Sequence, residues 1–253
     1  MNVTRGYLNS LRPQLTARDR EIIARLSQFK LMTGGQLERL LFGACSAASR
    51  ARNRQAVLKR LTDHRVLARL DRRIGGFGGG SADYVYTLDA AGQRLAETSE
   101  RPRRPYVWYD PTIQHYLAVS EVYVRLIEAQ QDDSLALLTF EAEPYCWRSF
   151  AGQTLKSDAL VQVGVASDGE PRKRTRFLEV DRGTQYGTKI ASKLPVYEQF
   201  WRYEHSQGRR MPLAVFLVQT TERLDYLTQL VASAPPLFEV VLFDHVVAAL
   251  SGS

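Results

Sequence analysis

The sequence predicts an α/β protein, α+β overall, in which a helical N-terminal domain precedes an α/β domain with a mixed sheet. The 253 residues fit two domains of ordinary size better than one. Helical patterns dominate the first hundred residues, whereas helices alternate with β-branched apolar runs further along the chain. The proline-rich sequence RPRRP between these regions favours a linker, because proline restricts the backbone on both sides. We therefore expect domains at residues 1–100 and 112–253, joined by a basic linker at 101–111.

Three helices and a hairpin are expected before the linker. Thr16 and Thr33 stand where helix N-caps are expected and Ser49 opens the third helix, each ahead of apolar residues spaced three and four apart. Alternating apolar residues on either side of the sequence GGFGGG predict a hairpin, and a short helix capped by Asp89 follows. The two strands and the short helix are expected at residues 66–70, 84–88 and 90–97. Three helices followed by a hairpin wing is the order typical of a winged helix-turn-helix domain, whose third helix enters the major groove of DNA.

The region after the linker is expected to form a mixed sheet flanked by helices. Its β-branched or fully apolar runs are bounded by amphipathic helical patterns, which is typical of an α/β domain. The expected helices are 112–131, 186–203 and 223–232. The expected strands are 135–140, 159–165, 176–180, 212–219 and 238–243.

The charge of the chain is distributed unevenly. Residues 1–105 carry 20 Lys and Arg against 9 Asp and Glu, a net charge of +11. Residues 106–253 carry 14 against 18, a net charge of −4. Such asymmetry indicates that the first half contacts a polyanion such as double-stranded DNA. The alternative is a protein that merely has a basic surface.

Several classes of protein are disfavoured by the composition. Two cysteines, Cys45 and Cys146, are too few for a disulfide framework or a zinc site, and we expect both to be buried or incidental thiols. There is no run of eighteen apolar residues and the first twenty residues lack a signal-peptide core, so we expect a cytoplasmic protein without a membrane segment. The sequence contains no phosphate-binding P-loop, dinucleotide fingerprint or nucleophile elbow.

The third expected helix carries most of the candidate DNA-binding side chains. Arginine can bond guanine edges, asparagine and glutamine can bond adenine, and every cation can pair with phosphate. The helix contributes Arg50, Arg52, Asn53, Arg54, Gln55, Lys59 and Arg60. Beside the glycine-rich loop, Arg72 and Arg73 suit contact with the DNA backbone or minor groove. The alternative is a solvated basic face without a ligand.

A second candidate site lies in the C-terminal half. Glu179 and Asp181 are two residues apart in an expected strand, so both side chains point to the same side, and Asp158 begins the preceding strand. Three converging carboxylates would bind Mg²⁺ and support hydrolysis of a phosphodiester. Lys189 and Lys193, four apart on the next helix, could neutralise charge there. The alternative is an ordinary turn with structural ion pairs.

A series of segments carries a resemblance to a known family. Three of the segments precede the linker, namely LTARDREIIARLSQFKLMTGGQLERLLF, RNRQAVLKRLTDHRVLARL and YVYTLDAAGQRL. Three follow it, namely HYLAVSEVYVRL, SDALVQV and FLEVDRGTQ. Together they resemble the replication-relaxation family of bacterial proteins, many of which are linked to plasmids and other mobile elements. The resemblance extends over roughly residues 15 to 243 and implies a role in plasmid replication or DNA relaxation.

The C-terminal half also resembles the PD-(D/E)XK nuclease fold, a restriction-endonuclease-like α/β domain. The resemblance implies that Asp158 and Glu179 bind metal. The chain departs from the motif, because Asp181 stands where the lysine is required and Ser157 replaces the proline. Lys189 or Lys193 could supply the missing amine from the helix, or the fold could have lost cleavage altogether.

Three functions follow from these patterns. The first is double-stranded DNA binding in plasmid or mobile-element replication, mobilisation or its control, with a homodimer on paired half-sites and replication or relaxase proteins as partners. The alternative is a Mg²⁺-dependent endonuclease or nickase that uses Asp158, Glu179 and Asp181, and no other cofactor is expected. The second alternative is a protein-docking module that does not bind DNA.

Overall fold

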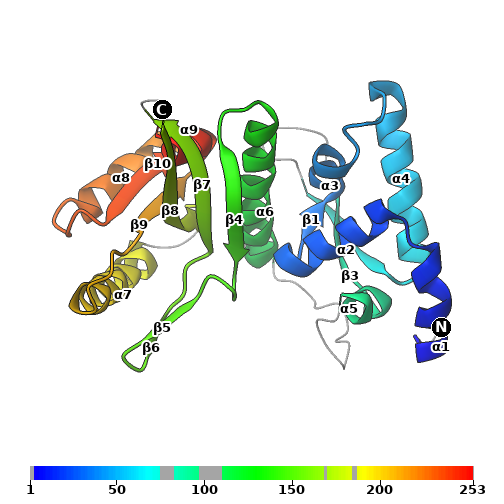
Figure 1. Cartoon of the computed structure of the whole chain (residues 1–253), viewed down its shortest axis with the longest axis horizontal. Helices are drawn as coiled ribbons and strands as arrows, with labels where there is room; N and C mark the ends of the chain where they lie inside the picture. Colours follow the sequence, from blue (N-terminus) through cyan, green and yellow to red (C-terminus); the bar gives the residue numbers. More distant parts are fainter. Residues whose placement is uncertain (1–2, 75–82, 97–109, 168–169, 184–186, 253) are drawn as a thin grey trace. The chain divides into compact units, whose positions relative to one another are not determined.

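The computed structural model describes residues 3–74, 83–96, 110–167, 170–183 and 187–252, and its elements are labelled in Figure 1. The chain divides into two compact units, Met1–Val124 and Arg125–Ser253, and the division falls inside helix α6 (Asp110–Gln131). The expected glycine-rich loop and nearly all of the expected linker lie outside the described residues. The predicted domain boundaries therefore stay predictions.

The helices of the first unit begin where the sequence places strong caps. Thr16 and Thr33 each accept a hydrogen bond from the backbone amide three residues later, and the side-chain oxygens of Asp19 and Gln36 accept one from the backbone amide of the cap residue. The helices of this unit are α1 (Arg5–Leu11), α2 (Ala17–Phe29), α3 (Gly34–Leu41), α4 (Ala47–Asp63) and α5 (Ala90–Leu95), with a 3-10 turn η1 (Arg12–Gln14).

The third predicted helix begins two residues earlier than expected. Helix α4 starts at Ala47 with Ser46 as the cap residue, and the hydroxyl of Ser49 donates to the carbonyl of Ser46 at 3.2 Å. Ser49 therefore lies inside the first turn, where its hydroxyl shares the carbonyl of Ser46 with the backbone amides of Ser49 and Arg50. The prediction that this helix opens at Ser49 was therefore wrong by two residues.

The expected hairpin is present and has a third strand. Strands β2 (Leu67–Ile74) and β3 (Asp83–Leu88) pair antiparallel, and β1 (Met32–Thr33) pairs with the other edge of β3. Val85 of β3 packs with buried Leu31 and with Leu117 of α6, so the sheet contributes to the same core as the helices.

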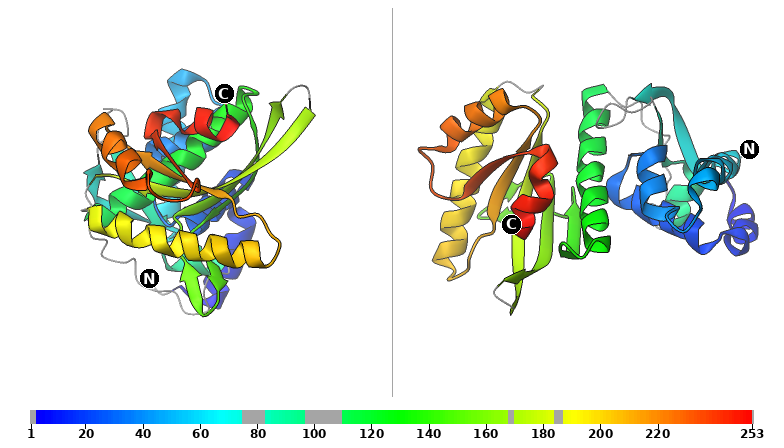
Figure 2. Two further views of the ribbon diagram at one scale, coloured as in Figure 1. Left: turned by 90° about the vertical axis from the view of Figure 1, so that its left-hand side faces the viewer. Right: turned by 90° about the horizontal axis from the view of Figure 1, so that it is seen from above.

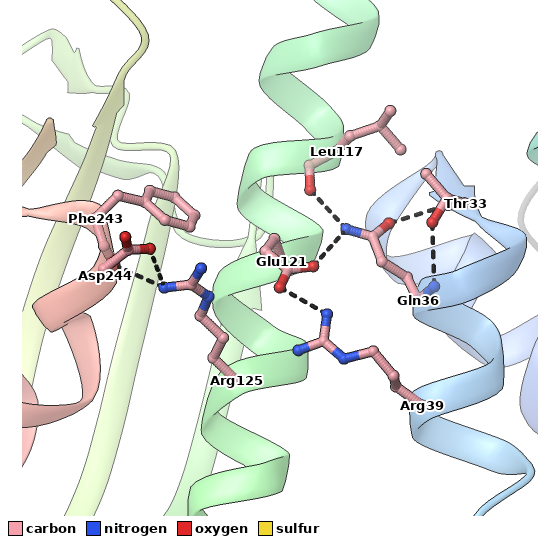
Figure 3. A network of polar contacts seen from close by, with 8 residues as sticks. All are labelled: Thr33, Gln36, Arg39, Leu117, Glu121, Arg125, Phe243 and Asp244. Atoms are coloured by element: carbon pink, nitrogen blue, oxygen red, sulfur yellow. Dashed lines mark hydrogen bonds and ion pairs between the residues drawn. The ribbon is translucent and has the colours of Figure 1, made fainter. Parts of the chain in front are cut away.

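A buried polar network joins α3 to the part of α6 that belongs to the first unit (Figure 3). Glu121 is only 3% exposed, and it accepts hydrogen bonds from Gln36 at 3.1 Å and from Arg39 at 2.7 Å. Gln36 also donates to the carbonyl of Leu117 at 3.0 Å. A buried carboxylate is tolerated here because charged and amide donors satisfy it.

The second unit is built on a five-stranded mixed sheet, which confirms the predicted α/β class. The strand order is β10-β9-β8-β7-β4, with parallel pairs β10–β9 and β9–β8 and antiparallel pairs β8–β7 and β7–β4. The strands are β4 (Ala136–Ala142), β7 (Ala159–Ser167), β8 (Glu170–Asp181), β9 (Leu213–Val218) and β10 (Phe238–Leu242). A two-stranded ribbon, β5 (Arg148–Phe150) and β6 (Gln153–Leu155), was not expected from the sequence.

Helices α7 (Gly187–Ser206) and α8 (Thr221–Val231) cover one face of this sheet (Figure 2). Phe177 of β8 packs on Tyr197 and Phe200 of α7, and Phe216 of β9 packs with Leu227 of α8. Because alternate residues of a strand share a face, Glu179 and Asp181 point to the same side as Phe177. The sheet thus directs both carboxylates towards α7 and α8.

The C-terminal segment is held to the start of the second unit. It consists of the 3-10 turn η2 (Phe243–His245) and helix α9 (Val246–Ser251). The guanidinium of Arg125 pairs with Asp244 at 2.8 Å and lies 4.9 Å from the ring centre of Phe243, and the residues are drawn in Figure 3.

In the described part of the chain, every helix is too short or too polar to cross a membrane.

Candidate functional site

The cations of α4 fall into two groups, and the first group is engaged inside the unit. One guanidinium nitrogen of Arg60 donates to both carboxylate oxygens of Asp19, at 2.7 and 2.8 Å, and Asp19 is completely buried at the start of α2. Burial raises the pKa of Asp19, but the hydrogen bonds from Arg60 and Thr16 outweigh it, so the pKa lies below its usual 3.8. Arg60 therefore anchors α4 to α2.

Arg54 is also engaged. Its guanidinium lies 3.3 Å from Glu38 of α3 and 3.6 Å from Asp83, the first residue of β3. Asp83 in turn accepts the backbone amide of Gly35 at the start of α3. Because one guanidinium connects three elements, Arg54 fixes the packing of the helices against the hairpin.

Arg50 and Asn53 turn back towards the segment before α4. Arg50 donates to the carbonyl of Cys45 and Asn53 contacts the sulfur of Cys45, both at 3.5 Å. Both side chains are partly buried. Contacts within the first unit thus orient four of the predicted DNA-binding residues, namely Arg50, Asn53, Arg54 and Arg60.

The second group lies on the outer face of α4. Arg52, Gln55 and Lys59 are exposed, and their spacing places them along one face of the helix. Lys59 pairs with Asp63 at 2.6 Å on the surface, where such a pair is weak. Among the described residues, Arg52 and Gln55 have no polar partner.

A hollow of about 560 Å³ lies between this face of α4 and the hairpin. Gln55 and Lys59 line it from the helix, and Arg69, Tyr84 and Tyr86 line it from the strands. The guanidinium of Arg69 lies 4.1 Å from the ring centre of Tyr84, so it is held above the sheet. Arg69 was not among the predicted residues.

The remaining two predicted DNA-binding residues lie on the hairpin. Arg72 and Arg73 belong to β2, but their side chains lie outside the described part of the structure.

The second candidate site brings together two carboxylates and one amine. Asp158 stands directly before β7, and it accepts the backbone amide of Val180 at 2.7 Å. Glu179 accepts the phenol of Tyr197 at 2.7 Å and the ammonium group of Lys193. The same ammonium lies 3.8 Å from Asp158. The cluster of Asp158, Glu179, Lys193 and Tyr197 is called the carboxylate–lysine cluster below.

The pKa values in this cluster are displaced by burial and by mutual charge. Burial and the neighbouring charge of Asp158 raise the pKa of Glu179 to about 7, although Lys193 and Tyr197 oppose the shift. The two carboxylates raise the pKa of Lys193 against the opposing effect of its burial. Glu179 is therefore close to its midpoint at neutral pH, as is typical of a group that exchanges protons.

Asp181 does not join the cluster. Asp181 is bonded to Arg223 of α8 and accepts the amide of Gly183 at 3.0 Å. Lys189 belongs to α7, but its side chain lies outside the described residues. Glu179 and Asp181 share a strand face as predicted, yet they face different helices.

The arrangement does not fit a divalent cation. Both oxygens of Glu179 and one oxygen of Asp158 already accept hydrogen bonds, and a single ammonium group serves both carboxylates. Within the described ranges, no three His, Cys, Asp or Glu side chains are grouped so that they could hold a metal ion. The expected set of Asp158, Glu179 and Asp181 is not assembled, because Arg223 holds Asp181.

The sequence contained signals for some partners that were missed. Tyr197 follows Lys193 by four residues and so shares its helix face, which would have placed the phenol near Glu179. Arg223, Glu38 and Asp83 are distant in sequence from the residues that they bind, and no local pattern identifies them.

Comparison with known proteins gives one match. A family model described as replication-relaxation matches residues 23–213, which is more than half of the chain. Neither curated proteins nor solved structures include a match to the chain.

Proposed function

Because the chain belongs to the replication-relaxation family, we propose that it binds double-stranded DNA in plasmid or mobile-element replication, mobilisation or its control. One observation carries the proposal. Arg52, Gln55 and Lys59 form an outward face on α4, in a region of net charge +11. A cationic helix face with an amide suits both the phosphate backbone and the base edges of a duplex.

The order of elements supports a winged helix-turn-helix as the binding domain. Helices α2, α3 and α4 precede the β2–β3 hairpin, as in domains that insert the third helix into the major groove. Arg52 would contact a phosphate or guanine, Gln55 an adenine edge and Lys59 a phosphate. Arg69 at the hairpin would contact the backbone beside the groove.

The mode of assembly is part of the same proposal. Helix-turn-helix proteins commonly bind paired half-sites about 34–36 Å apart as two-fold dimers. We expect a homodimer on a palindromic site, with replication or relaxase proteins as partners. Sedimentation of the protein with a duplex that carries one or two half-sites measures this stoichiometry.

Binding to a fluorescent duplex across a salt series tests the proposal. Arg52→Ala is expected to weaken binding and to reduce the log–log salt slope by about 0.9, the loss of one phosphate contact. Gln55→Ala is expected to alter the preference among sequences while leaving the salt slope unchanged.

The matched control is Arg5→Ala, which removes one exposed positive charge from α1. Arg54→Ala and Arg60→Ala are unsuitable variants, because both residues hold the unit together. If Arg52→Ala, Gln55→Ala and Lys59→Ala combined bind like the control, α4 is not the DNA-binding surface. Absence of any binding at low salt would favour a docking module.

The second candidate function is a DNA endonuclease or nickase. It is favoured by the meeting of Asp158, Glu179 and Lys193, the three residue types of the PD-(D/E)XK motif, with the lysine supplied from a helix. The present contacts of the carboxylates do not fit a metal ion. Incubation of supercoiled plasmid with Mg²⁺ or Mn²⁺ tests this candidate. Equal nicking by wild type and Glu179→Ala would assign the cleavage to a contaminant.

A further inference from the structure

One aromatic side chain of the second unit differs from the others in its exposure. Tyr145 is 66% exposed, more than any other large apolar side chain in the described part of the chain. It lies in the turn of residues 143–147, which connects β4 to the β5–β6 ribbon, and Figure 1 shows this ribbon extending beyond the end of β4. A single exposed apolar residue is common on protein surfaces, so its surroundings decide whether it has a role.

The turn that carries Tyr145 is held by hydrogen bonds on both sides. The backbone amide of Tyr145 donates to the carbonyl of Ala142 at 2.9 Å. The guanidinium of Arg148 donates to the carbonyls of Tyr145 and Trp147, at 2.9 and 3.0 Å, and it also pairs with Glu141. The ring of Tyr145 is therefore pre-organised for a ligand, because its backbone has little freedom left to lose on binding.

A cation without a carboxylate partner lies beside this turn. The ammonium group of Lys156 lies 4.9 Å from the ring centre of Trp147, and Trp147 itself packs against the core that contains Phe150. Lys156 is exposed, and no carboxylate of the described residues pairs with it. Because Tyr145 and Trp147 are two residues apart, their Cα atoms are separated by at most about 7 Å. An exposed ring and an unpaired ammonium group thus lie close together.

This surface adjoins the carboxylate–lysine cluster. The backbone amide of Glu143 donates to the carbonyl of Asp158 at 3.3 Å, and the thiol of Cys146 donates to the carbonyl of Ser157 at 3.0 Å. Lys156 precedes Asp158 by only two residues. The turn of residues 143–147 is therefore fixed directly to the segment that supplies one of the two carboxylates of the cluster.

The chemistry of the ring and the ammonium group favours a single-stranded nucleic acid. An aromatic ring can stack on any base, and a lysine can pair with phosphate. In a duplex, neighbouring bases cover each other, so a ring on a protein turn reaches only bases that are unpaired. Aromatic anchors also occur in protein interfaces, but there they lie inside a patch that excludes water. The neighbours Ser149 and Gln153 are instead exposed and polar.

We propose that Tyr145 and Lys156 form a binding site for single-stranded DNA, in which the phenol ring stacks on an unpaired base and the ammonium group pairs with a phosphate of the same strand. Trp147 positions that ammonium group. Two acids, Glu141 and Glu143, are close in sequence to the ring, so stacking rather than net charge provides most of the affinity. The inference rests on the proposed function in that the ligand is DNA, but it assigns a different surface and an unpaired form of the DNA.

Binding of the full-length chain to a fluorescent strand of about 20 thymidines tests the site. Tyr145→Ala is expected to weaken binding about 5- to 150-fold at every salt concentration, which is the effect of losing one stacked base. Tyr145→Phe keeps the ring and should bind within about twofold of wild type. Lys156→Ala is expected to reduce the log–log salt slope by about 0.7, the share of one phosphate on a single strand. Thermal unfolding of Tyr145→Ala should be unchanged, because the side chain is exposed.

The matched control is Tyr226→Ala, which removes another exposed aromatic ring of the second unit. Tyr226 is 45% exposed, and the guanidinium of Arg223 lies 5.0 Å from its ring centre, so it too combines a ring with a cation. If Tyr145→Ala binds the strand as tightly as this control does, the inference is overturned.

A duplex measured in parallel separates this inference from the proposed function. If Arg52→Ala weakens duplex binding while Tyr145→Ala leaves strand binding unchanged, the role of α4 stands and the stacking site does not. If wild type binds the duplex but not the strand, the inference alone fails, and if wild type binds neither, both fail. A wild type that ignores the strand but loses self-association on Tyr145→Ala would instead assign the turn to a contact between copies.

Discussion

Asp19 in the first unit and Glu179 in the second are both buried carboxylates that face a partly exposed cation, yet their pKa values move in opposite directions. Asp19 accepts hydrogen bonds from Arg60 and Thr16, and among the residues that the structure describes no second carboxylate bonds these donors. Glu179 shares the ammonium group of Lys193 with Asp158, and its burial together with the negative charge of Asp158 raises its pKa to about 7.

The difference shows that an ion pair alone does not fix the charge of a buried acid. Burial raises the pKa of both acids, and the outcome depends on whether hydrogen-bond donors outweigh it, as at Asp19, or a second carboxylate adds to it, as at Glu179. The site around Asp19 is charged and structural at neutral pH. The carboxylate–lysine cluster holds a group that gains or loses a proton near pH 7, which is a property expected of functional sites.

The largest expected effect follows from removing the shared cation. Lys193→Met leaves two buried carboxylates without their ammonium partner, and we expect a loss of about 3 kcal/mol in the free energy of unfolding, near the low end for a broken buried pair because Lys193 is 37% exposed. Denaturant unfolding measures this loss. Lys173→Met, at an exposed position, is the control and should change stability by less than about 0.5 kcal/mol. Equal stability of the two variants would mean that Lys193 does not neutralise the cluster.

The second effect is a pH dependence specific to Glu179. Its pKa is raised in the folded state, so its contribution to stability is complete below the usual pKa of 4.5 and is lost as pH rises through about 7. The full loss is on the order of 3 kcal/mol, since the pKa rises from 4.5 to about 7 and each pKa unit corresponds to about 1.4 kcal/mol.

The free energies of unfolding of wild type and Glu179→Gln, measured at pH 5 and pH 8, test the direction of this pH dependence. The glutamine variant cannot ionise, so its stability relative to wild type should be greater at pH 8 than at pH 5. A constant difference between the two proteins at both pH values would rule out a raised pKa.

The third effect concerns Asp19, whose pKa is lowered. Its contribution to stability is present above pH 3.8 and is lost as pH falls through the folded-state value. Asp19→Ala should cost about 2 kcal/mol near neutral pH, because it removes the capping box and the partner of Arg60. Asp63→Ala, which breaks the exposed pair with Lys59, is the control and should cost less than about 0.5 kcal/mol. If Asp63→Ala lowered the free energy of unfolding more than Asp19→Ala does, the structural role of Asp19 would be contradicted.

The smallest effect separates the anchoring cations from the exposed ones. Arg54→Ala should lower the free energy of unfolding by about 1 kcal/mol, because it leaves Glu38 and Asp83 without their cation. Arg52→Ala should change it by less than about 0.5 kcal/mol. Thermal melts of the two variants provide the measurement. A destabilised Arg52→Ala protein would show that Arg52 has a structural partner and would weaken its assignment to DNA.

The sequence alone determined where most elements lie. Thr16 and Thr33 begin helices because each side chain bonds the amide three residues later, which is a local interaction. The strands of the mixed sheet follow from apolar runs long enough to span a buried layer. Strands β1, β5 and β6 were not foreseen, because two or three residues form a strand only when a partner strand is supplied by the fold.

Only the tertiary structure decided which charged side chains are available. Helical spacing places Arg52, Arg54 and Arg60 on α4, but whether each is exposed depends on acids from other elements. Likewise, strand alternation put Glu179 and Asp181 on one face, whereas the choice between Lys193 and Arg223 as partners required α7 and α8 to be in place. Local periodicity fixes the direction of a side chain. The charge that it meets there comes from residues distant in sequence, and only folding brings them together.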